Sequence, residues 1–517
     1  MMVTGANFIN GQWFARGDFD NINPCNGEVI GKFPSSTKEE VDSAIAAARA
    51  AFPAWKALSR VKRAEYFDVL AQLVKENVQG LCEAISLETG KNLNESYAEV
   101  MEALHMIQYV AGQGKVACGD VMASELSTKD AYVVRKPKGV VGVVAPWNFP
   151  LAIGSTWTTA PTLVEGNCVV HKPSELTPLV AGLMAELYQK AGFPAGVYNL
   201  VHGNEVAGKA VVEGDVDVIL FTGSAEVGQL IRQHCASTWN KTCSCELGSK
   251  SAVLVFEDAD LDLAEDATVA SSFKLTGQRC VSAGRILIQR SIYRNFVERF
   301  VARAAKVVPG DPFVENPGFC GPLISREHFE RVELFNNLVR ADKEATIRLE
   351  GVDNGSNFMQ PFVYETEWRD VPYLKQEVFG PHVALIPFDT VEDAIRIYND
   401  TDYGLAVGIV TENFRIMRKC RDECNAGMVY LNGGSVAAES HLPFGGVGKS
   451  GNGYKPGNGA HFHRRWSECH ERPARCVLVA TLLRRIGNHD SVQSLLSRGG
   501  GLSDGSSTVS RSVPIRV

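Results

Sequence analysis

Apolar positions in the first 115 residues recur at helical spacing. Thr37 and Glu40 have the spacing of a capping box, and the apolar positions after them share one helix face: Val41, Ile45, Ala48 and Phe52. Pro53 is expected to end this helix, and a second helix is predicted to start near residue 60. Earlier in the chain, Asn10-Gly11 predicts a tight hairpin turn. We therefore expect a hairpin followed by mostly helical chain that carries little chemistry.

From residue 139 the pattern changes to short β-branched runs separated by helix-length intervals: 139–144, 168–171, 197–201, 218–221 and 252–256. Runs this apolar predict parallel strands of one sheet covered by helices on both faces, which makes the chain an α/β protein. Ligands bind such sheets at the carboxyl ends of the strands. The polar residues that follow the strands are expected to converge there: Asn148, Lys172, Glu175, Gly223 and Ser224.

The alternation continues with longer intervals to about residue 454, which predicts a second α/β domain. After that the composition changes. From Pro456 onward the chain has nine arginines, no lysine and four acidic residues, and residues 497–512 are rich in glycine and serine. We expect an atypical, disordered tail over residues 455–517.

The composition narrows the possible functions. The chain has 517 residues, 45% hydrophobic and 21% charged, with a formal net charge of −7. This excludes a disordered protein or a small binding module, and the lack of a basic excess argues against nucleic acid as a partner. Thirteen scattered cysteines predict reduced thiols. A polar start and the lack of a bilayer-length apolar run predict a cytoplasmic protein with no membrane partner.

Two residues are candidates for covalent chemistry. Cys280 follows a glycine turn, where a base or helix terminus can activate a thiol; a buried, inert cysteine is the alternative. Glu246 precedes a predicted strand at the ligand-binding edge; a solvated glutamate is the alternative.

Two further segments are candidates for nucleotide binding. Lys172 and Glu175 follow a strand, where a carboxylate can accept both hydroxyls of a ribose; a surface ion pair is the alternative. Residues 221–228 lead from a strand into a helix through small residues, which lets a phosphate approach the helix amides. This segment lacks the GxGxxG fingerprint of the usual dinucleotide fold.

Seven short segments occur in a fixed order: Ala145-Pro146-Trp147-Asn148-Phe149-Pro150, Lys172-Pro173-Ser174-Glu175, Phe221-Thr222-Gly223-Ser224, Glu246-Leu247-Gly248, Gly277-Gln278-Arg279-Cys280, Glu377-Val378-Phe379-Gly380-Pro381 and Pro443-Phe444-Gly445-Gly446. Across residues 8–454 they closely resemble the NAD(P)-dependent aldehyde dehydrogenase superfamily. The ordered set is far more specific than any single segment, and it favours the functional interpretation of Cys280 and Glu246.

The resemblance implies an aldehyde-dehydrogenase-like fold. Residues 1–118 and 140–246 would form a parallel-sheet NAD-binding domain, 119–139 an oligomerisation hairpin, and 247–454 an α/β catalytic domain. A homodimer or homotetramer is expected. The tail would weaken it, because no alternating segment follows Tyr454 where the family has an interface strand. No metal is expected, since Cys469, His470 and Cys476 fit no standard zinc spacing.

The resemblance also implies roles for the site residues. Cys280 would attack the aldehyde, the Asn148 amide and the Cys280 N–H would stabilise the oxyanion, and Glu246 would activate the water that hydrolyses the thioester. The residues assigned to the cofactor are Pro146, Trp147, Lys172, Glu175, Phe221, Thr222, Gly223, Ser224, Val227, Gly228, Leu247, Glu377 and Phe379. Of these, Lys172 and Glu175 would hold the adenosine ribose, and Glu377 and Phe379 the nicotinamide ribose and ring. Glu175 would repel a 2′-phosphate, which favours NAD, while Lys172 keeps NADP possible.

Two departures from the family fall within the matched region. Ser249 replaces the usual second glycine after Glu246-Leu247-Gly248, and it is expected to crowd the nicotinamide and reduce activity. The interval from Asn148 to Asn167 is about one residue longer than usual.

The substrate is expected to be an aldehyde, with a dicarboxylate semialdehyde slightly ahead of an aliphatic aldehyde. Small residues in 433–441 could admit an ω-carboxylate, and Arg279 or Arg285 could pair with it or belong to structural ion pairs. The competing hypothesis is an inactive homologue with a structural or binding role. Retention of Cys280, Glu246 and Asn148 together argues for an enzyme.

Overall fold

Four of the five apolar runs after residue 139 lie side by side in one sheet. The computed structural model describes residues 3–116, 119–352, 357–452 and 476–479. The sheet has seven strands, in the order β12 (Thr242–Glu246), β11 (Val218–Thr222), β8 (Val140–Val144), β9 (Cys168–Lys172), β10 (Tyr198–Leu200), β2 (Ala6–Ile9) and β3 (Gln12–Ala15). From β12 to β10 all pairings are parallel. The prediction of an α/β protein is confirmed.

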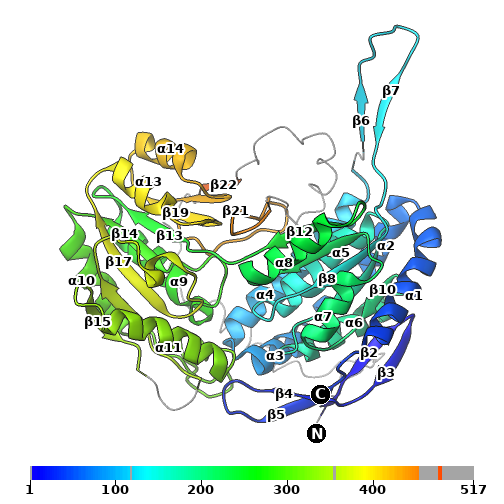
Figure 1. Ribbon diagram of the computed structural model, residues 1–517, viewed down its shortest axis with the longest axis horizontal. Coiled ribbons are helices and arrows are strands. Elements are labelled where there is room, and N and C mark those ends of the chain that lie inside the picture. Colours follow the sequence, from blue (N-terminus) through cyan, green and yellow to red (C-terminus); the bar gives the residue numbers. More distant parts are fainter. Residues whose placement is uncertain (1–2, 117–118, 353–356, 453–475, 480–517) are drawn as a thin grey trace, which may run out of the picture.

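The fifth run forms β13 (Ala252–Val255) in a different sheet, so the prediction of a single sheet was wrong for it. The eight strands of this second sheet run in the order β15 (Thr346–Glu350), β16 (Phe362–Glu365), β17 (His382–Phe388), β14 (Arg285–Gln289), β13, β19 (Ala406–Val410), β20 (Met428–Leu431) and β22 (Cys476–Val479). The few residues between β12 and β13 are too short for a parallel crossover, which needs a dozen or more. The chain therefore passes directly from one lobe to the other (Figure 1).

The strand β22 corrects a second expectation, that no strand follows Tyr454. It pairs in parallel with β20 at the edge of the eight-stranded sheet. The rest of the tail, residues 455–475 and 480–517, lies outside the described residues.

Helices cover both sheets: α1 (Lys38–Ala57), α2 (Arg60–Glu76), α3 (Val78–Thr89), α4 (Leu93–Gln113), η1 (Pro150–Trp157), α5 (Thr159–Val164), α6 (Pro178–Lys190), α7 (Glu205–Glu213) and α8 (Ala225–Ala236) with the first, and α9 (Leu261–Phe273), η2 (Lys274–Gly277), α10 (Tyr293–Ala304), α11 (Arg326–Arg340), α12 (Pro372–Lys375), α13 (Val391–Asn399) and α14 (Phe414–Glu423) with the second. The Thr37–Glu40 capping box is present at the start of α1. Pro53 lies inside α1 instead of ending it, which corrects that prediction. Trp55, just beyond it, is buried and donates from Nε1 to the Leu163 carbonyl at 2.9 Å, which holds the last turn in place.

The predicted hairpin turn is confirmed. Asn10 and Gly11 both have left-handed φ angles, 51° and 77°, and join β2 to β3 with Ile9 opposite Gln12. Two left-handed residues in succession are the requirement of this tight turn.

The segment after Asn148 forms a π-helix, η1, rather than an α-helix. Its hydrogen bonds reach back five residues, as in the 3.3 Å bond from the Thr158 N–H to the Ile153 carbonyl. A π-helix absorbs an extra residue without lengthening the element, which accounts for the long interval between Asn148 and Asn167.

Two buried glutamates cap the first turns of helices. Glu88 accepts from the Leu179 and Val180 N–H groups of α6 at 2.7 and 2.9 Å. Glu99 accepts from the Leu151 and Ala152 N–H groups of η1 at 2.9 and 3.1 Å. A carboxylate there satisfies free N–H groups and opposes the positive end of the helix.

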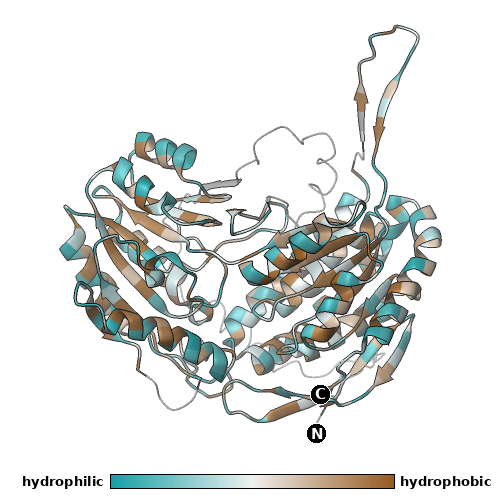
Figure 2. Cartoon of the chain, in the orientation of Figure 1, coloured by the Kyte–Doolittle hydropathy of each residue, from teal (hydrophilic) through white to brown (hydrophobic). Residues whose placement is uncertain are grey.

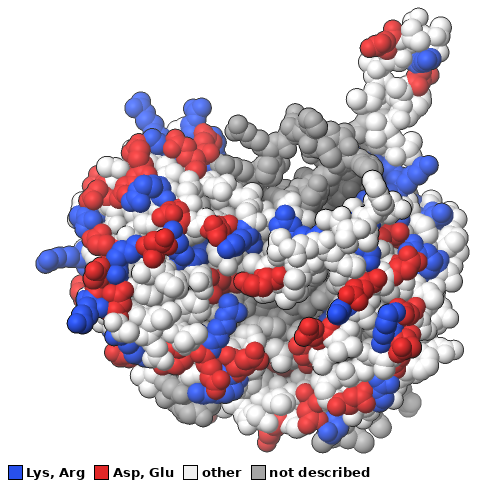
Figure 3. Space-filling model, in the orientation of Figure 1, with Lys and Arg blue, Asp and Glu red and all other residues white. Residues whose placement is uncertain are grey.

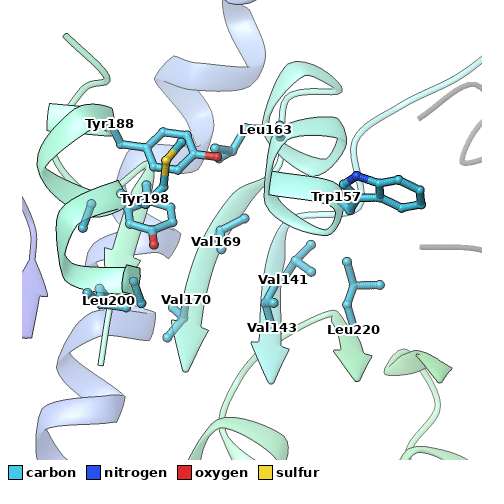
Figure 4. Close-up of a cluster of buried hydrophobic side chains, with 14 of the residues drawn as sticks. Val141, Val143, Trp157, Leu163, Val169, Val170, Tyr188, Tyr198, Leu200 and Leu220 are labelled. Carbon is cyan, nitrogen blue, oxygen red and sulfur yellow. The ribbon is translucent and has the colours of Figure 1, made fainter. Parts of the chain in front are cut away.

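The core of the first lobe lies along its central strands. Figure 4 shows Val141 and Val143 of β8 between Leu220 of β11 on one side and Val169 and Val170 of β9 on the other, with Tyr188 and Tyr198 beyond β9. The rings of the two tyrosines stack with their centroids 4.4 Å apart. In both sheets the strands are mostly hydrophobic, and polar residues lie on the outer helix faces (Figure 2). This burial fixes the strand ends, where the site residues lie.

The remaining strands form small sheets: β1 (Val3–Thr4) with β5 (Val29–Phe33) and β4 (Phe19–Ile22), β18 (Tyr403–Gly404) with β21 (Val447–Gly448), and β6 (Gly119–Met122) with β7 (Ala131–Val134). The β6–β7 hairpin projects away from both lobes (Figure 1). Within the described chain, no helix combines the length and apolarity needed to cross a membrane.

Candidate active site

The loop before Cys280 has an unusual backbone. Leu275, Thr276 and Gly277 have left-handed φ angles of 52°, 55° and 73°. Such conformations are costly for non-glycine residues and need support from their surroundings. Thr276 Oγ1 donates to the Gly321 carbonyl at 2.6 Å, and the Leu275 N–H donates to Glu95 Oε1 at 2.9 Å. A Cβ on Gly277 would lie 2.2 Å from the Gly380 carbonyl oxygen, so glycine is required there.

Asn148 reaches this loop from the end of β8. Its Nδ2 donates to the main-chain carbonyl of Gln278 at 3.0 Å, two residues before Cys280. An amide NH₂ has two protons, so the second can serve another acceptor. The Gln278 side chain is buried and anchors the loop through the Leu275 and Pro322 carbonyls, both at 3.1 Å. Asn148 and the turn of Cys280 are thus held together.

The electrostatic surroundings keep the Cys280 thiol protonated at rest. Burial of the thiolate, together with the charges of Glu377 and Glu246, raises its pKa to about 12. The residue itself is partly exposed. A nucleophile in this state needs a base.

Glu246 is the last residue of β12, at the carboxyl edge of the first sheet. Its main chain is held on both sides: its carbonyl accepts from the Gly223 N–H at 3.1 Å, and the following Leu247 N–H donates to the Ser450 carbonyl at 2.9 Å. The residue is buried, and its charge acts on Cys280. The structure therefore brings Asn148, Glu246 and Cys280 together from three separate segments.

A buried layer of charge lies beneath the Asn148 segment. Lys91 pairs with Glu99, and both side chains are almost completely inaccessible to solvent. Arg279 pairs with Glu95 at 3.0 Å. The Phe149 ring receives both cations, with Lys91 Nζ 4.0 Å from its centroid and the Arg279 guanidinium 5.4 Å from it.

The sequence interpretation missed this layer, since it assigned little chemistry to the first 115 residues. The available signal was the i,i+4 spacing of Glu95 and Glu99 on the otherwise apolar face of α4.

The adenosine end of the candidate cofactor site lies at the ends of β9 and β11. Lys172 Nζ lies 3.3 Å from Glu175 Oε2 and donates to the Gly203 carbonyl at 2.7 Å. The ion pair considered as the alternative is present, with Lys172 buried and Glu175 half-exposed. Burial lowers the pKa of Lys172 from its usual value.

The start of α8 follows Phe221 and Thr222 and offers its amides to a phosphate. Ser224 is the N-cap, and its Oγ accepts from the Val227 N–H at 3.3 Å. A Cβ on Gly228 would lie 2.4 Å from Leu247, so α8 packs closely against the residue that follows Glu246. A Cβ on Gly223 would lie 2.5 Å from the Phe221 ring.

Three of the residues predicted for the nicotinamide end lie close together: Glu377, Phe379 and Trp147. Pro146 leads from β8 into this segment. Phe379 has a left-handed φ of 62°, and its ring meets Trp147 edge-on at 5.6 Å. Trp147 also meets His328 at 5.2 Å, a residue that no sequence motif indicated. Burial raises the pKa of Glu377 to about 7.

A polar cavity of about 860 Å³ adjoins this end. Its lining includes Glu377, Glu226 of α8, Arg331 of α11, Tyr403 and Lys449. This volume is in the range of small-molecule sites. Acidic and basic side chains are interspersed over the viewed face, with no single-sign patch (Figure 3).

Three sequence expectations about nearby side chains are decided by the contacts. Arg285 is fully buried and donates to the Lys250 carbonyl and, at 3.0 Å, to the Ile397 carbonyl, so it is structural. Arg279 is held by Glu95. The Ser249 hydroxyl points into the protein, where it donates to the Cys280 carbonyl.

Metal and disulfide chemistry have no counterpart in the described residues. Among them, no group of three or more His, Cys, Asp or Glu side chains is arranged to hold a metal ion. The ten cysteines whose side chains the structure describes are free thiols.

Comparison with known proteins decides the family. A model of the aldehyde dehydrogenase family matches residues 13–470. The chain belongs to this family. Among its relatives, the α-ketoglutaric semialdehyde dehydrogenase of Bacillus subtilis is 35% identical over 86% of this chain and 93% of its own length. The mitochondrial succinate-semialdehyde dehydrogenase of Arabidopsis thaliana is 38% identical over 86% of this chain and 85% of its own.

Solved structures agree with this membership. The betaine aldehyde dehydrogenase of Staphylococcus aureus in complex with NAD+ superimposes with a TM-score of 0.83 at 32% identity, covering 87% of this chain and 91% of that one. As a member of the aldehyde dehydrogenase family, the chain is an NAD(P)-dependent aldehyde dehydrogenase, and its fold is that of the family.

Proposed function

We propose that Cys280 is the nucleophile, Asn148 and the Cys280 N–H are the oxyanion donors, and Glu246 is the general base in oxidation of an aldehyde to its acid. The single observation that carries this assignment is the convergence of these residues, with Asn148 bonded two residues from Cys280 and the Glu246 charge acting on the thiol. Among the cysteines whose side chains the structure describes, only Cys243 is also partly exposed, and it lies within β12 rather than in a loop.

The cofactor residues fit a dinucleotide. Glu175 offers carboxylate oxygens to a ribose, the α8 N-terminus offers amides to a pyrophosphate, and Glu377 offers a second carboxylate to the other ribose. A bound NAD supplies the hydride acceptor. We propose NAD as the favoured cofactor because a 2′-phosphate would meet the Glu175 charge.

The chain's own residues account for the proton and carbon chemistry. The thiol proton passes to solvent as Cys280 Sγ bonds to the aldehyde carbon, and the oxyanion is held by the Asn148 amide and the Cys280 N–H. Loss of hydride from that carbon leaves a thioester on Cys280. The Glu246 carboxylate then removes a proton from water, and the resulting hydroxide attacks the thioester. Sγ leaves as the carboxylic acid forms and takes the proton from Glu246, which restores both residues.

The assignment is tested by separating hydride transfer from hydrolysis. Cys280→Ser is expected to bind NAD and lose nearly all turnover. Glu246→Gln is expected to release a burst of about one NADH per active site and then stall at the thioester. The control is Cys82→Ser, which removes a buried thiol whose pKa burial also raises, to about 11, and which is expected to retain turnover. Full activity of Cys280→Ser would refute the assignment.

We propose the hairpin of β6 and β7 as the oligomerisation element. The rest of the chain is proposed to form an NAD-binding domain (1–118 and 140–246) and a catalytic domain (247–454). Six large apolar side chains on the hairpin are exposed: Val121, Met122, Leu126, Tyr132, Val133 and Val134. A two-stranded hairpin is marginally stable alone, so a second copy covering these side chains supports a homodimer or homotetramer. A cytoplasmic location is also proposed, supported by the free thiols.

The substrate is proposed to be an aldehyde with a second polar group. Support comes from relatives named as semialdehyde dehydrogenases at 35–38% identity. Of the two arginines considered for an ω-carboxylate, Arg285 already donates to main-chain carbonyl groups. Arg279 is ion-paired with Glu95 and would have to bind the substrate carboxylate at the same time. Initial rates with succinic semialdehyde, propanal and benzaldehyde test this proposal, and a preference for the last two would contradict it.

A further inference from the structure

Ser249 makes an unusual set of contacts for one residue. Its N–H donates to Glu377 Oε1 at 2.7 Å, and its Oγ–H donates to the Cys280 carbonyl. A carbonyl can only accept, so the Ser249 proton is committed to it, and Ser251, whose Oγ lies 2.9 Å away, must donate to Ser249 Oγ. The residue is buried, and these hydrogen bonds hold it in place.

We propose that Ser249 is a positioning residue that couples the carboxylate of Glu377 to the main chain of the nucleophile Cys280. The proposal rests on the proposed roles of Glu377 and Cys280. A glycine at this position would keep the N–H bond to Glu377 and lose the bond to Cys280. The serine departure therefore adds one specific connection.

The connection is short and stiff. From Glu377 Oε1 it passes through the Ser249 N, Cα, Cβ and Oγ atoms to the Cys280 carbonyl. Gly248, just before it, has no room for a side chain, since a Cβ there would lie 2.3 Å from Glu377 Oε2. Glu377 cannot shift when a ribose hydroxyl binds it without moving the Ser249 backbone. The Ser249 hydroxyl then transmits this movement to the peptide group that carries the nucleophile.

The same loop provides a matched control. Ser435 is also buried, and its Oγ donates to the carbonyl of Val281, the next residue after Cys280, at 2.7 Å. Its own N–H donates to Ser271 Oγ at 2.9 Å rather than to the cofactor site. Ser249→Ala and Ser435→Ala thus each remove one buried hydroxyl from neighbouring carbonyls of one loop, but only the first breaks the connection to Glu377.

The test is the rate of Cys280 alkylation by iodoacetamide, followed by peptide mapping, with and without saturating NAD. A coupling free energy of ordinary size corresponds to about a fivefold change or more in a binding equilibrium, and we expect NAD to change the wild-type alkylation rate by at least this factor. Ser249→Ala is expected to reduce the change to less than twofold, whereas Ser435→Ala is expected to keep it. Ser249→Thr retains the hydroxyl, and a cavity of about 20 Å³ beside Ser249 gives room for part of its methyl group. This variant should keep the NAD effect.

The outcomes separate this proposal from the proposed function. An equal NAD effect in wild type and Ser249→Ala, an equal loss in both alanine variants, or no NAD effect in the wild type would each overturn the coupling. None of these results touches the role of Cys280, which the NADH burst measures. NAD affinity, measured by tryptophan fluorescence, verifies that each variant is folded. If Ser249→Ala fails to fold, Ser249→Thr takes its place. Loss of the NAD effect in Ser249→Thr would then count against the proposal.

Discussion

Arg279, the residue before the proposed nucleophile Cys280, forms an ion pair at 3.0 Å with Glu95 of helix α4. Glu95 also accepts from the Leu275 N–H at 2.9 Å, so one carboxylate holds both ends of the left-handed turn that carries Cys280. The pair is largely buried, with side-chain exposures of 15% and 9%. The turn thus depends on a helix far from it in sequence.

Removing the Glu95 charge should destabilise the protein. Glu95→Gln leaves Arg279 as a buried cation without its partner, which should lower the free energy of unfolding by about 3 kcal/mol. It also releases the turn that carries Cys280, which should lower kcat. Urea unfolding and steady-state kinetics measure the two effects. The control is Glu65→Gln, which breaks the exposed pair with Lys62 and should cost under about 1 kcal/mol. Equal costs for the two variants would contradict the structural role of Glu95.

Cofactor affinity should depend on the ionisation of Glu377. Its pKa of about 7 means that the carboxylate needed to accept ribose hydroxyls is mostly protonated at pH 6. The dissociation constant for NAD should therefore be about tenfold higher at pH 6 than at pH 8, as the competent fraction falls. Fluorescence titration at several pH values measures this. The Glu377→Gln variant should bind weakly with no such dependence, and a flat wild-type profile would count against the assignment.

The same raised pKa has an opposite consequence for stability. In the unfolded chain a glutamate titrates near its usual value, so between there and about pH 7 the folded protein binds more protons than the unfolded one. The stability that neutral Glu377 contributes to the folded protein is present at low pH and is lost as the pH rises through about 7. Without cofactor, Glu377→Gln should gain thermal stability relative to wild type between pH 6 and pH 8. A relative loss over that interval would show that the buried carboxylate is better compensated than we infer.

The choice of cofactor should be governed by Glu175. Replacing it with Gln removes one negative charge near the 2′-position, which at about 4 Å from a doubly charged phosphate amounts to roughly tenfold or more in affinity. The ratio of kcat/KM for NADP to that for NAD should rise accordingly. Glu186→Gln, in an exposed pair with Lys190, is the control and should leave the ratio unchanged. An unaltered ratio in Glu175→Gln would place the ribose elsewhere.

Oligomerisation should depend on the projecting hairpin. Val121→Glu together with Val134→Glu places charges on two side chains that are 77% and 71% exposed in the single chain. If a second copy buries them, the assembly should dissociate, and light scattering coupled to gel filtration should show a smaller mass. An unchanged mass would exclude the hairpin from the interface.

Much of the site was accessible from the sequence because its residues follow strands. Asn148 and Lys172 follow the apolar runs 139–144 and 168–171, and parallel strands bring such ends to one edge. Glu246 was placed before a predicted strand, and the strand β12 that it ends was not predicted. The roles of Cys280 and Glu377 needed the ordered motifs, since neither residue differs locally from an inert one.

The rest depended on tertiary contacts. The crossing from β12 to the second sheet, the continuation of α1 through Pro53, and the direction of the Ser249 hydroxyl are set by partners distant in sequence: Ser450, Leu163 and Cys280. No periodicity or motif encodes these contacts. The π-helix was visible only as an interval of unusual length.

The carboxylates that cap α6 and η1 have a consequence for how variation in this chain should be interpreted. Neither Glu88 nor Glu99 is a proposed catalytic residue, yet each holds two amides at the start of a helix that follows a candidate site residue, Glu175 before α6 and Asn148 before η1. A saturation screen for growth or turnover should therefore score α3 and α4 as severely as the nucleophile's own loop. A map of intolerant positions would include both the supporting residues, such as Glu88 and Glu99, and the site residues. Only chemical probes would distinguish these two groups.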